Sequence, residues 1–416
     1  MTKHGFGKLA SLAEASRIIE DVAGKTGRET VSLEDADGRV LAEDIKSSID
    51  VPHFQKSAMD GFAVIAEDTF GASNTSPKHL KVIESVTAGV IPRKEVRKGE
   101  CIELTTGAPL PKGADAVLMI EYAEKEDGSI VFYKACAPGE NTISAGSDVR
   151  SGQLIFSKGT RLNPRYLGVL SSVGIRCVKV SKAPSVAYFS TGNEVLSPGQ
   201  ALLPGKVYDI NTRTVVDTLK EHGCNVHCLG LVSDNVSDIK KAILSGIDDV
   251  DLLIFSGGSS LGGEDFMLDA VGQIGDVLVH GIASKPGKPV LVGKVRSSPV
   301  IGLPGYPTSA LSNVYSLVLP AIYRMMGSEF RLKKAYAVLE RKVASTIGRF
   351  EFLPVRLKVS EAKKNGLDTS SPFFTASPVM KGSSAITTLS DADGFICIDE
   401  NTEVVRKGDV VEVSLF

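Results

Sequence analysis

A glycine- and serine-rich stretch, SGGSSLGGEDF at residues 256–266, has the residue types of an anion-binding loop. It follows a short apolar run, and its glycines allow backbone N–H groups to face a ligand without obstruction by side chains. We therefore expect substrate phosphate to bind at its start, at Ser256, Gly257, Gly258 and Ser259. The alternative interpretation is a surface loop that ends in an aspartate, Asp265, capping the next helix.

Three carboxylates and two lysines in similar turns suggest how an anion and a cation would be held together. Glu194, Asp234 and Asp265 each follow a strand-like run, and converging carboxylates repel one another unless a cation lies among them. Carboxylate oxygens are ligands that Mg²⁺ prefers. Lys285 and Lys288 flank a Pro-Gly turn in SKPGKP and suit a polyanionic ligand. The pattern predicts a magnesium site beside a phosphate or oxyanion site.

Residues 184–328 contain the elements that would position these groups. Apolar strand-like runs alternate there with amphipathic helices, which is typical of a mostly parallel sheet covered on both faces. Ligands bind beyond the carboxyl ends of such strands. The turns STGNEV, VSDN, SGGSSLGGED and GLPGYPTSA all follow strand-like runs, so they should share one edge. The predicted helices cover residues 211–223, 235–247, 264–275 and 307–326.

The rest of the chain has a different texture. Residues 8–23 have the apolar spacing of an amphipathic helix. Residues 47–150 consist of short β-type runs broken by Gly and Pro, which predicts a β-rich domain. Residues 329–416 return to this texture, and we expect a small C-terminal β-barrel.

Composition argues against some classes of partner. The 416 residues carry a formal net charge of −2, which gives no reason to expect nucleic acid or an anionic membrane as a partner. No run approaches the roughly 18 apolar residues of a membrane-spanning helix. The N-terminus has no apolar signal-peptide core. We expect a cytoplasmic protein.

The segment EHGCNVHCLGLV combines histidines and cysteines, and a metal site has to be weighed there. Cys224, Val226 and Cys228 alternate as one face of a strand, which places His227 on the other face. We therefore interpret the two cysteines as small buried residues.

Six motifs in order carry a resemblance to a known family: FQKSAMDGFAV (54–64), TTGAPLPKGADAVLMIE (105–121), STGNEV, SGGSSLGGEDF, KPGKP and GLPGYPTSA. In this order the chain resembles the molybdopterin molybdenumtransferases, a family that includes the C-terminal part of gephyrin. The resemblance covers nearly the whole chain.

The resemblance implies a multidomain fold of α/β and β domains. Its parts would be an elongated helical/β domain in two segments (1–46 and 151–183), a β-rich domain (47–150), a three-layer α/β molybdopterin-binding domain (184–328) and a C-terminal β-barrel domain (329–416). It also implies insertion of molybdate, or tungstate, into adenylylated molybdopterin with Mg²⁺-dependent release of AMP. The enzyme would be a homodimer with composite active sites. A molybdopterin adenylyltransferase would be its upstream partner.

The family's site residues transfer to this chain position by position. The resemblance assigns catalysis to Asp60, Thr106, Asp148 and Asp265, metal binding to Glu194, Asp234 and Asp265, and substrate binding to the 256–259 stretch, Lys285, Lys288, Pro304, Pro307 and Ser383. Pro304 and Pro307 would stiffen a turn against which a flat pterin lies.

Three positions depart from the family pattern. Ile143 stands where many members have an oxyanion-binding arginine, and Gly281 stands where a lysine is often found. Tyr306 replaces the usual Asn. The first two changes remove positive charge from the expected oxyanion region, which leaves both oxyanion affinity and the choice between molybdate and tungstate open.

Two other functions remain as alternatives. A molybdopterin adenylyltransferase shares the α/β domain and the SGG loop but needs no β-rich domain bearing SAMDG. A non-catalytic scaffold paralogue would keep the fold without requiring Asp60 or Asp265, and both carboxylates are present.

Overall fold

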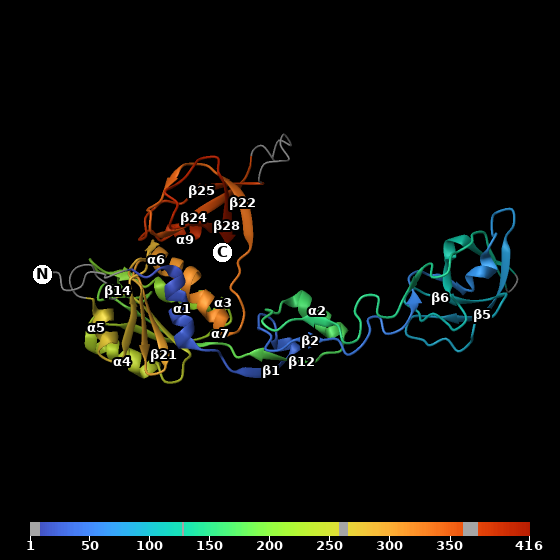
Figure 1. Cartoon of the computed structure of the whole chain (residues 1–416), viewed down its shortest axis with the longest axis horizontal. Coiled ribbons are helices and arrows are strands. Elements are labelled where there is room, and N and C mark those ends of the chain that lie inside the picture. The colour runs from blue at the N-terminus through green and yellow to red at the C-terminus, as the bar shows by residue number, and fades with distance from the viewer. Residues whose placement is uncertain (1–8, 127–128, 258–264, 361–372) are drawn as a thin grey trace. The chain divides into compact units, whose positions relative to one another are not determined.

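The computed structural model describes residues 9–126, 129–257, 265–360 and 373–416. The chain divides into two compact units, which we describe separately (Figure 1). The first unit comprises Met1–Glu43, Lys158–Asn163 and Cys177–Phe416, and the second comprises Asp44–Ser157 and Pro164–Arg176. Among the described residues, no helix has both the length and the apolarity needed to cross a membrane.

A six-stranded sheet forms the centre of the first unit. Its order is β16 (Asn225–Val232), β13 (Ser185–Thr191), β17 (Leu252–Ser256), β21 (Ser298–Leu303), β20 (Leu291–Val295) and β18 (Asp276–His280). The first four strands are parallel, and β20 and β18 are antiparallel to their neighbours. The prediction of a mostly parallel sheet is therefore confirmed.

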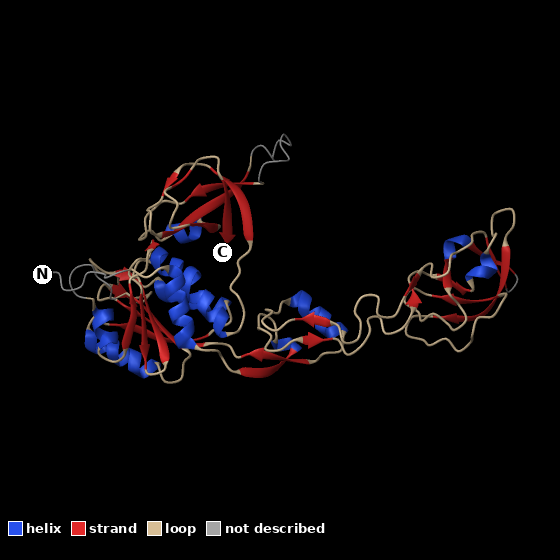
Figure 2. Cartoon of the chain, in the orientation of Figure 1, coloured by secondary structure: helices blue, strands red, loops and turns tan. Residues whose placement is uncertain are grey.

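Helices cover both faces of this sheet (Figures 1 and 2). One face carries α1 (Leu12–Ala23), α3 (Asn211–Glu221), α6 (Pro307–Asn313), a π-helical segment η4 (Val314–Val318) and α7 (Leu319–Met325). The other face carries α4 (Val236–Gly246) and α5 (Phe266–Gly272). Alternation along β13 explains the two cores, because Tyr188 packs on the first face and Phe189 on the second.

The N-terminal helix α1 belongs to this core although it lies far from the sheet in sequence. Ala15 and Ile19 are fully buried, and α1 packs against β21, η4 and α7. The helix begins at Leu12 rather than at residue 8, because the Ser11 side chain caps it by accepting the Glu14 N–H at 3.1 Å.

The edge strand β16 corrects one sequence interpretation. Cys224 is buried, but Cys228 is exposed. Cys228 pairs with Tyr188 ahead of a register shift, so the two-residue alternation holds up to it, but β16 is the edge strand of the sheet and residues 227–231 are all exposed. The expectation that both cysteines are buried is therefore wrong for Cys228.

A closed five-stranded barrel ends the chain, as predicted. Its strands follow the order β24 (Phe350–Val359), β25 (Phe374–Pro378), β22 (Lys334–Leu339), β28 (Val410–Leu415) and β26 (Gly394–Ile398), and β26 pairs again with β24. The two-residue strand β19 (Ser284–Lys285), from the KPGKP turn, pairs parallel with β24. This pairing joins the barrel to the α/β domain.

The second unit is rich in β-structure, also as predicted. Its main sheet has the order β7 (Ala116–Met119), β4 (Gly61–Val64), β6 (Glu100–Leu104), β5 (Lys78–Val86), β9 (Ser129–Phe132) and β8 (Ala123–Glu126). Two short antiparallel pairs and one helix complete it: β3 (Lys56–Ser57) with β10 (Thr142–Ile143), β2 (Ile45–Lys46) with β11 (Leu154–Phe156), and α2 (Pro164–Ser172).

A half-buried histidine, His222, couples the first unit's stability to pH. Arg161 donates to the Tyr323 hydroxyl at 2.7 Å, and that oxygen lies 2.9 Å from Nδ1 of His222. The hydroxyl can donate its proton to Nδ1 when the imidazole is neutral. Burial, and secondarily the charge of Arg161, lower the pKa of His222 from 6.5 to about 4.

We expect acid to destabilise this unit through His222. The unfolded chain takes up the proton below about pH 6.5 and the folded one only near pH 4, so stability is lost as pH falls through this window. We compare the urea concentration at the unfolding midpoint at pH 7 and at pH 4.5. Between these pH values the midpoint should fall less for His222→Phe than for the wild type. His227→Phe, on an exposed position, is the matched control. Equal losses in wild type and His222→Phe would contradict the assignment.

Candidate functional site

Loops at the carboxyl ends of the parallel strands meet in the first unit. The Gly257 N–H donates to the carbonyl of Leu303 at 3.1 Å, and a Cβ on Gly305 would lie 3.6 Å from Gly257 Cα. The Asn211 side-chain N–H donates to the carbonyl of Gly305 at 2.8 Å. The start of the glycine-rich stretch, the GLPGYP turn and the start of α3 are therefore neighbours. Pro304 is buried in this turn.

Gly257 is required by its backbone rather than by a ligand. Its φ is +105°, and a Cβ would overlap the carbonyl oxygen of Thr191. Its N–H is donated to the carbonyl of Leu303, and this hydrogen bond holds the start of the glycine-rich stretch beside the end of β21. Gly258 and Ser259, the other predicted phosphate-binding residues, lie outside the described residues.

A buried chain of hydroxyl groups anchors Ser256. The Tyr188 hydroxyl lies 2.7 Å from Ser256 Oγ and 3.0 Å from Ser190 Oγ, and burial raises the pKa of Tyr188. Ser190 Oγ donates to Asp209 Oδ1 at 3.2 Å, and Thr212 donates to the same carboxylate. Asp209 thus terminates the chain at the loop edge. No motif identified in the sequence indicated this network.

The structure brings Glu194 and Asp234 together. Asp234 accepts a short hydrogen bond from the Thr191 hydroxyl, and its N–H donates to Asn193 Oδ1 at 3.1 Å. Burial raises the pKa of Asp234, the Thr191 hydrogen bond opposes this rise, and the negative charge of Glu194 adds to it. A cation between the two carboxylates would relieve that repulsion. Their oxygens fit Mg²⁺.

Asp265 is held by other partners. It is 6% exposed, its Oδ1 accepts the Leu268 N–H at 3.1 Å as the cap of α5, and its Oδ2 lies 2.9 Å from Nε2 of His280. Within the described ranges, no three His, Cys, Asp or Glu residues group closely enough to hold a metal ion. The capping interpretation is thus observed. Metal binding by Asp265 stays a prediction. No sequence pattern had indicated His280 as the partner of Asp265.

The KPGKP turn and the barrel meet through Lys285. Its Nζ lies 3.1 Å from Oε1 of Glu351, a carboxylate that is 6% exposed, and the two residues are direct neighbours in the β19–β24 register. Lys288 lies three residues along. Ser383, on a barrel loop, accepts the Thr308 N–H at 3.3 Å through its carbonyl. The barrel therefore contributes contacts to two of the predicted substrate-binding loops.

Asp60 and Thr106 are paired in the second unit. Asp60 Oδ1 accepts the N–H of Thr106 at 2.6 Å and its hydroxyl at 2.8 Å. The backbone hydrogen bond, followed by the hydroxyl, lowers the pKa of Asp60, so this exposed carboxylate is ionised. Gly61 admits no Cβ, which would overlap the Leu118 carbonyl. Asp148 is exposed, and its N–H donates to the Val51 carbonyl at 3.0 Å.

Family models match three successive parts of the chain. Residues 10–174 match the MoeA N-terminal region (domains I and II), residues 187–324 match a probable molybdopterin-binding domain, and residues 336–416 match the MoeA C-terminal region (domain IV). The molybdopterin molybdenumtransferase of Haemophilus influenzae is 33% identical over 96% of this chain and 97% of its own length. This chain belongs to the MoeA family.

Solved structures agree with this assignment to the MoeA family. Two crystal structures of molybdopterin biosynthesis MoeA proteins from Pyrococcus horikoshii resemble the chain over 98% of its length, with TM-scores of 0.81 and 0.84 at 41% and 30% identity. They are covered over 99% and 100% of their own lengths. The molybdopterin molybdenumtransferase of Bacillus subtilis is 32% identical over 97% of this chain and 93% of its own.

Position 143, where the MoeA resemblance leads us to expect an arginine, lies beside a different cation. Ile143 is the direct antiparallel partner of Lys56 in the β3–β10 pair, so the two side chains share a face. In the described part of the chain no ion pair of Lys56 is found. One positive charge is therefore present on this face.

We predict that Ile143→Arg tightens oxyanion binding, because a guanidinium donates two hydrogen bonds to a tetrahedral anion and adds to the Lys56 charge. Calorimetric titration with molybdate and tungstate should show a dissociation constant lowered by about tenfold, equivalent to ~1.4 kcal/mol. Ile143→Gln, of similar length and uncharged, is the control. Unchanged binding of both oxyanions by Ile143→Arg would mean that position 143 does not face the oxyanion.

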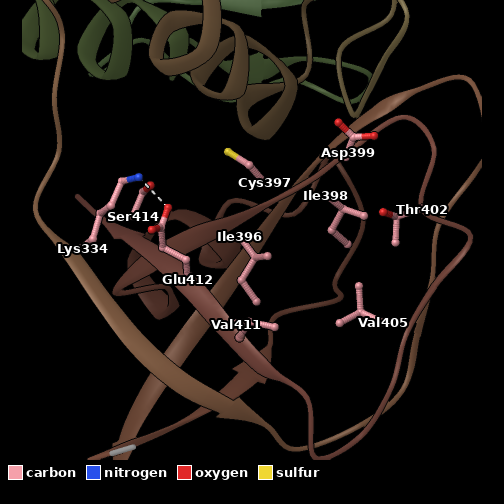
Figure 3. Close-up of a pocket in the computed structure, with 10 residues that line it drawn as sticks. All are labelled: Lys334, Ile396, Cys397, Ile398, Asp399, Thr402, Val405, Val411, Glu412 and Ser414. Carbon is pink, nitrogen blue, oxygen red and sulfur yellow. Dashed lines mark ion pairs between the residues drawn. The ribbon is translucent and has the colours of Figure 1, made fainter.

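The barrel carries an open hollow of about 440 Å³ between β26 and β28 (Figure 3). An ion pair of 2.5 Å joins Lys334 and Glu412 at its rim, and Ile396, Ile398 and Val411 form an apolar wall. No predicted site residue is among the ten described residues that line it. In this MoeA protein the hollow is thus separate from the loops where chemistry is expected.

Proposed function

We propose that this chain is a molybdopterin molybdenumtransferase that inserts molybdate into adenylylated molybdopterin and releases AMP with Mg²⁺. The main support is that Gly257, Gly305 and Asn211 contact one another at the carboxyl edge of the sheet. The chain also matches the family models along its length. Tungstate is the alternative oxyanion. The activity belongs to molybdenum cofactor biosynthesis.

Glu194 and Asp234 would hold Mg²⁺ through carboxylate oxygens. Burial mainly raises the pKa of Asp234 and the charge of Glu194 adds to the rise, which supports this role because a cation would offset both effects. The cation would neutralise charge that develops as the phosphoanhydride breaks. Asp265 would join them only after exchanging its hydrogen bond with His280.

Lysines on the KPGKP turn would hold the substrate's anionic groups. The buried Glu351 carboxylate orients Lys285 and limits the rotamer freedom of its long side chain. The pair is net neutral, so Lys285 would donate hydrogen bonds to the anion while Lys288 supplies additional charge. The 256–259 stretch would bind phosphate, with Ser256 anchored by the Tyr188 hydroxyl.

The pterin would lie against the turn of Pro304 and Pro307. Pro304 is buried, and Pro307 is the first residue of α6. Ser383 would approach from the barrel, a role supported by its carbonyl contact with Thr308.

Asp60, Thr106 and Asp148 would complete the site from a second copy of the chain. The proposed enzyme is a cytoplasmic homodimer with two composite sites, and a molybdopterin adenylyltransferase supplies its substrate. The four domain ranges given from the sequence are part of this proposal.

The function is tested by incubating the purified protein with adenylylated molybdopterin, Mg²⁺ and molybdate and following AMP by chromatography. We expect AMP release that depends on Mg²⁺ and on the oxyanion. Incubation with ATP and molybdopterin is the control, since an adenylyltransferase would consume ATP. No AMP release from the adenylylated substrate would contradict the proposal.

A further inference from the structure

Two buried polar atoms beside the 304–307 turn lack hydrogen-bond partners in the described part of the chain. They are Oδ1 of Asn211, a residue 7% exposed, and Oγ1 of Thr308, a residue 4% exposed. Buried polar groups in folded proteins are almost always hydrogen-bonded, so two such atoms at one turn call for an explanation.

The orientation of the Asn211 amide is fixed. Its Nδ2 donates to the Gly305 carbonyl at 2.8 Å, so the opposite atom is the oxygen, which only accepts. Thr308 is held through its backbone N–H, which donates to the Ser383 carbonyl, and its hydroxyl is left to donate or accept. Asn211 begins α3, Thr308 is the second residue of α6, and the two helices pack together.

The Asn211 oxygen and the Thr308 hydroxyl together favour one class of ligand. Phosphate and metal oxyanions offer only acceptor oxygens, and an acceptor such as Asn211 Oδ1 repels them. An apolar group would leave both atoms unsatisfied. A heterocycle with an exocyclic amino group beside a ring nitrogen offers one donor and one acceptor. These match the Asn211 oxygen and the Thr308 hydroxyl.

We propose that Asn211 and Thr308 bind the amino-bearing edge of the substrate's heterocycle. The inference rests on the proposed function, whose substrate contains two such edges: the 2-amino group of the pterin and the 6-amino group of the adenine. Both atoms have almost no exposed area, so the heterocycle reaches them only if the adjacent turn moves on binding. Gly305 and Tyr306 of that turn are exposed.

The test compares ligands in which a carbonyl replaces the amino group, a change that also converts the neighbouring ring nitrogen from an acceptor to an N–H donor. Calorimetry with AMP and inosine monophosphate probes the adenine edge. Fluorescence titration with pterin and lumazine, its 2,4-dioxo analogue, probes the pterin edge. In the wild type, one pair should differ in dissociation constant by about tenfold or more, as expected when a polar group of the site is left unpaired. That pair identifies the edge that binds here.

Thr308→Val and Asn211→Leu should each reduce this discrimination to about twofold or less. Thr218→Val is the matched control, because its hydroxyl already donates to the Thr214 carbonyl at 2.6 Å within the same helix α3. It should discriminate as the wild type does. Discrimination retained by both site variants, or absent from the wild type in both pairs, would overturn the inference.

Stability separates the proposal from a structural role. Removing an unpartnered hydroxyl should leave the unfolding midpoint of Thr308→Val unchanged or raised. A lowered midpoint would mean that a buried water satisfies the hydroxyl, and would overturn the inference for Thr308. Failure of the proposed function is distinguishable, since it appears as absent AMP release by the wild type.

Discussion

Asp265→Asn is expected to keep its fold and to reduce AMP release by about 100-fold. The loss corresponds to ~2.7 kcal/mol of transition-state stabilisation, typical of removing one well-placed electrostatic group. The fold should survive because asparagine caps helices as well as aspartate does, and Asp265 caps α5 through the Leu268 N–H. The rate of AMP release by Asp265→Asn should also depend less steeply on Mg²⁺ concentration than the wild-type rate.

Asp269→Asn is the matched control, because Asp269 lies one turn further along α5. AMP release measured across a Mg²⁺ titration, with circular dichroism of both variants, decides the outcome. Wild-type rates for a folded Asp265→Asn would show that this carboxylate serves only as a helix cap and a partner of His280.

Mixing two inactive variants is expected to restore about a quarter of wild-type activity. Asp60→Ala and Asp265→Ala each disable one half of the proposed composite site. When the two chains are unfolded together and refolded, random pairing makes half of the dimers mixed. Each mixed dimer has one site with both lesions and one with none, so roughly a quarter of all sites are intact.

The prediction separates two arrangements. A site contained within a single chain stays inactive in every dimer, because each chain carries one lesion. Recovered activity is measured as AMP release by the unfractionated mixture, and differently tagged chains confirm that mixed dimers are present. No recovery in confirmed mixed dimers would exclude the shared site. Co-refolding each variant with itself is the control for reactivation.

The sequence predicted the central sheet well because its signals are local. Strand-like runs and amphipathic helices alternate from 184 to 328, and the observed elements follow that order. The failures have non-local causes. Cys228 is exposed because its strand lies at the edge of the sheet. The helix predicted over 307–326 is observed, with a π-helical segment at Val314–Val318 that the apolar pattern did not indicate.

The sequence indicated which residues form the candidate site, but not which other residues contact them. Glu194 and Asp234 were expected at one edge, and they interact. His280, which holds Asp265, comes from a strand 15 residues later, and Glu351, which holds Lys285, comes from the barrel. No local pattern identifies either partner. The unpartnered atoms of Asn211 and Thr308 appear only once two helices are packed.

The packing of α1 has a consequence for how this protein is made. The helix contacts α7, whose residues leave the ribosome about 300 residues after α1 itself. At a synthesis rate of about 5–20 residues per second, the apolar face of α1 has no α7 to pack against for roughly 15–60 seconds. During that interval Ala15 and Ile19 are exposed in a nascent chain, although the finished protein buries both completely. This helix is thus translated long before it can dock, and nascent-chain chaperones have a long opportunity to bind its apolar face.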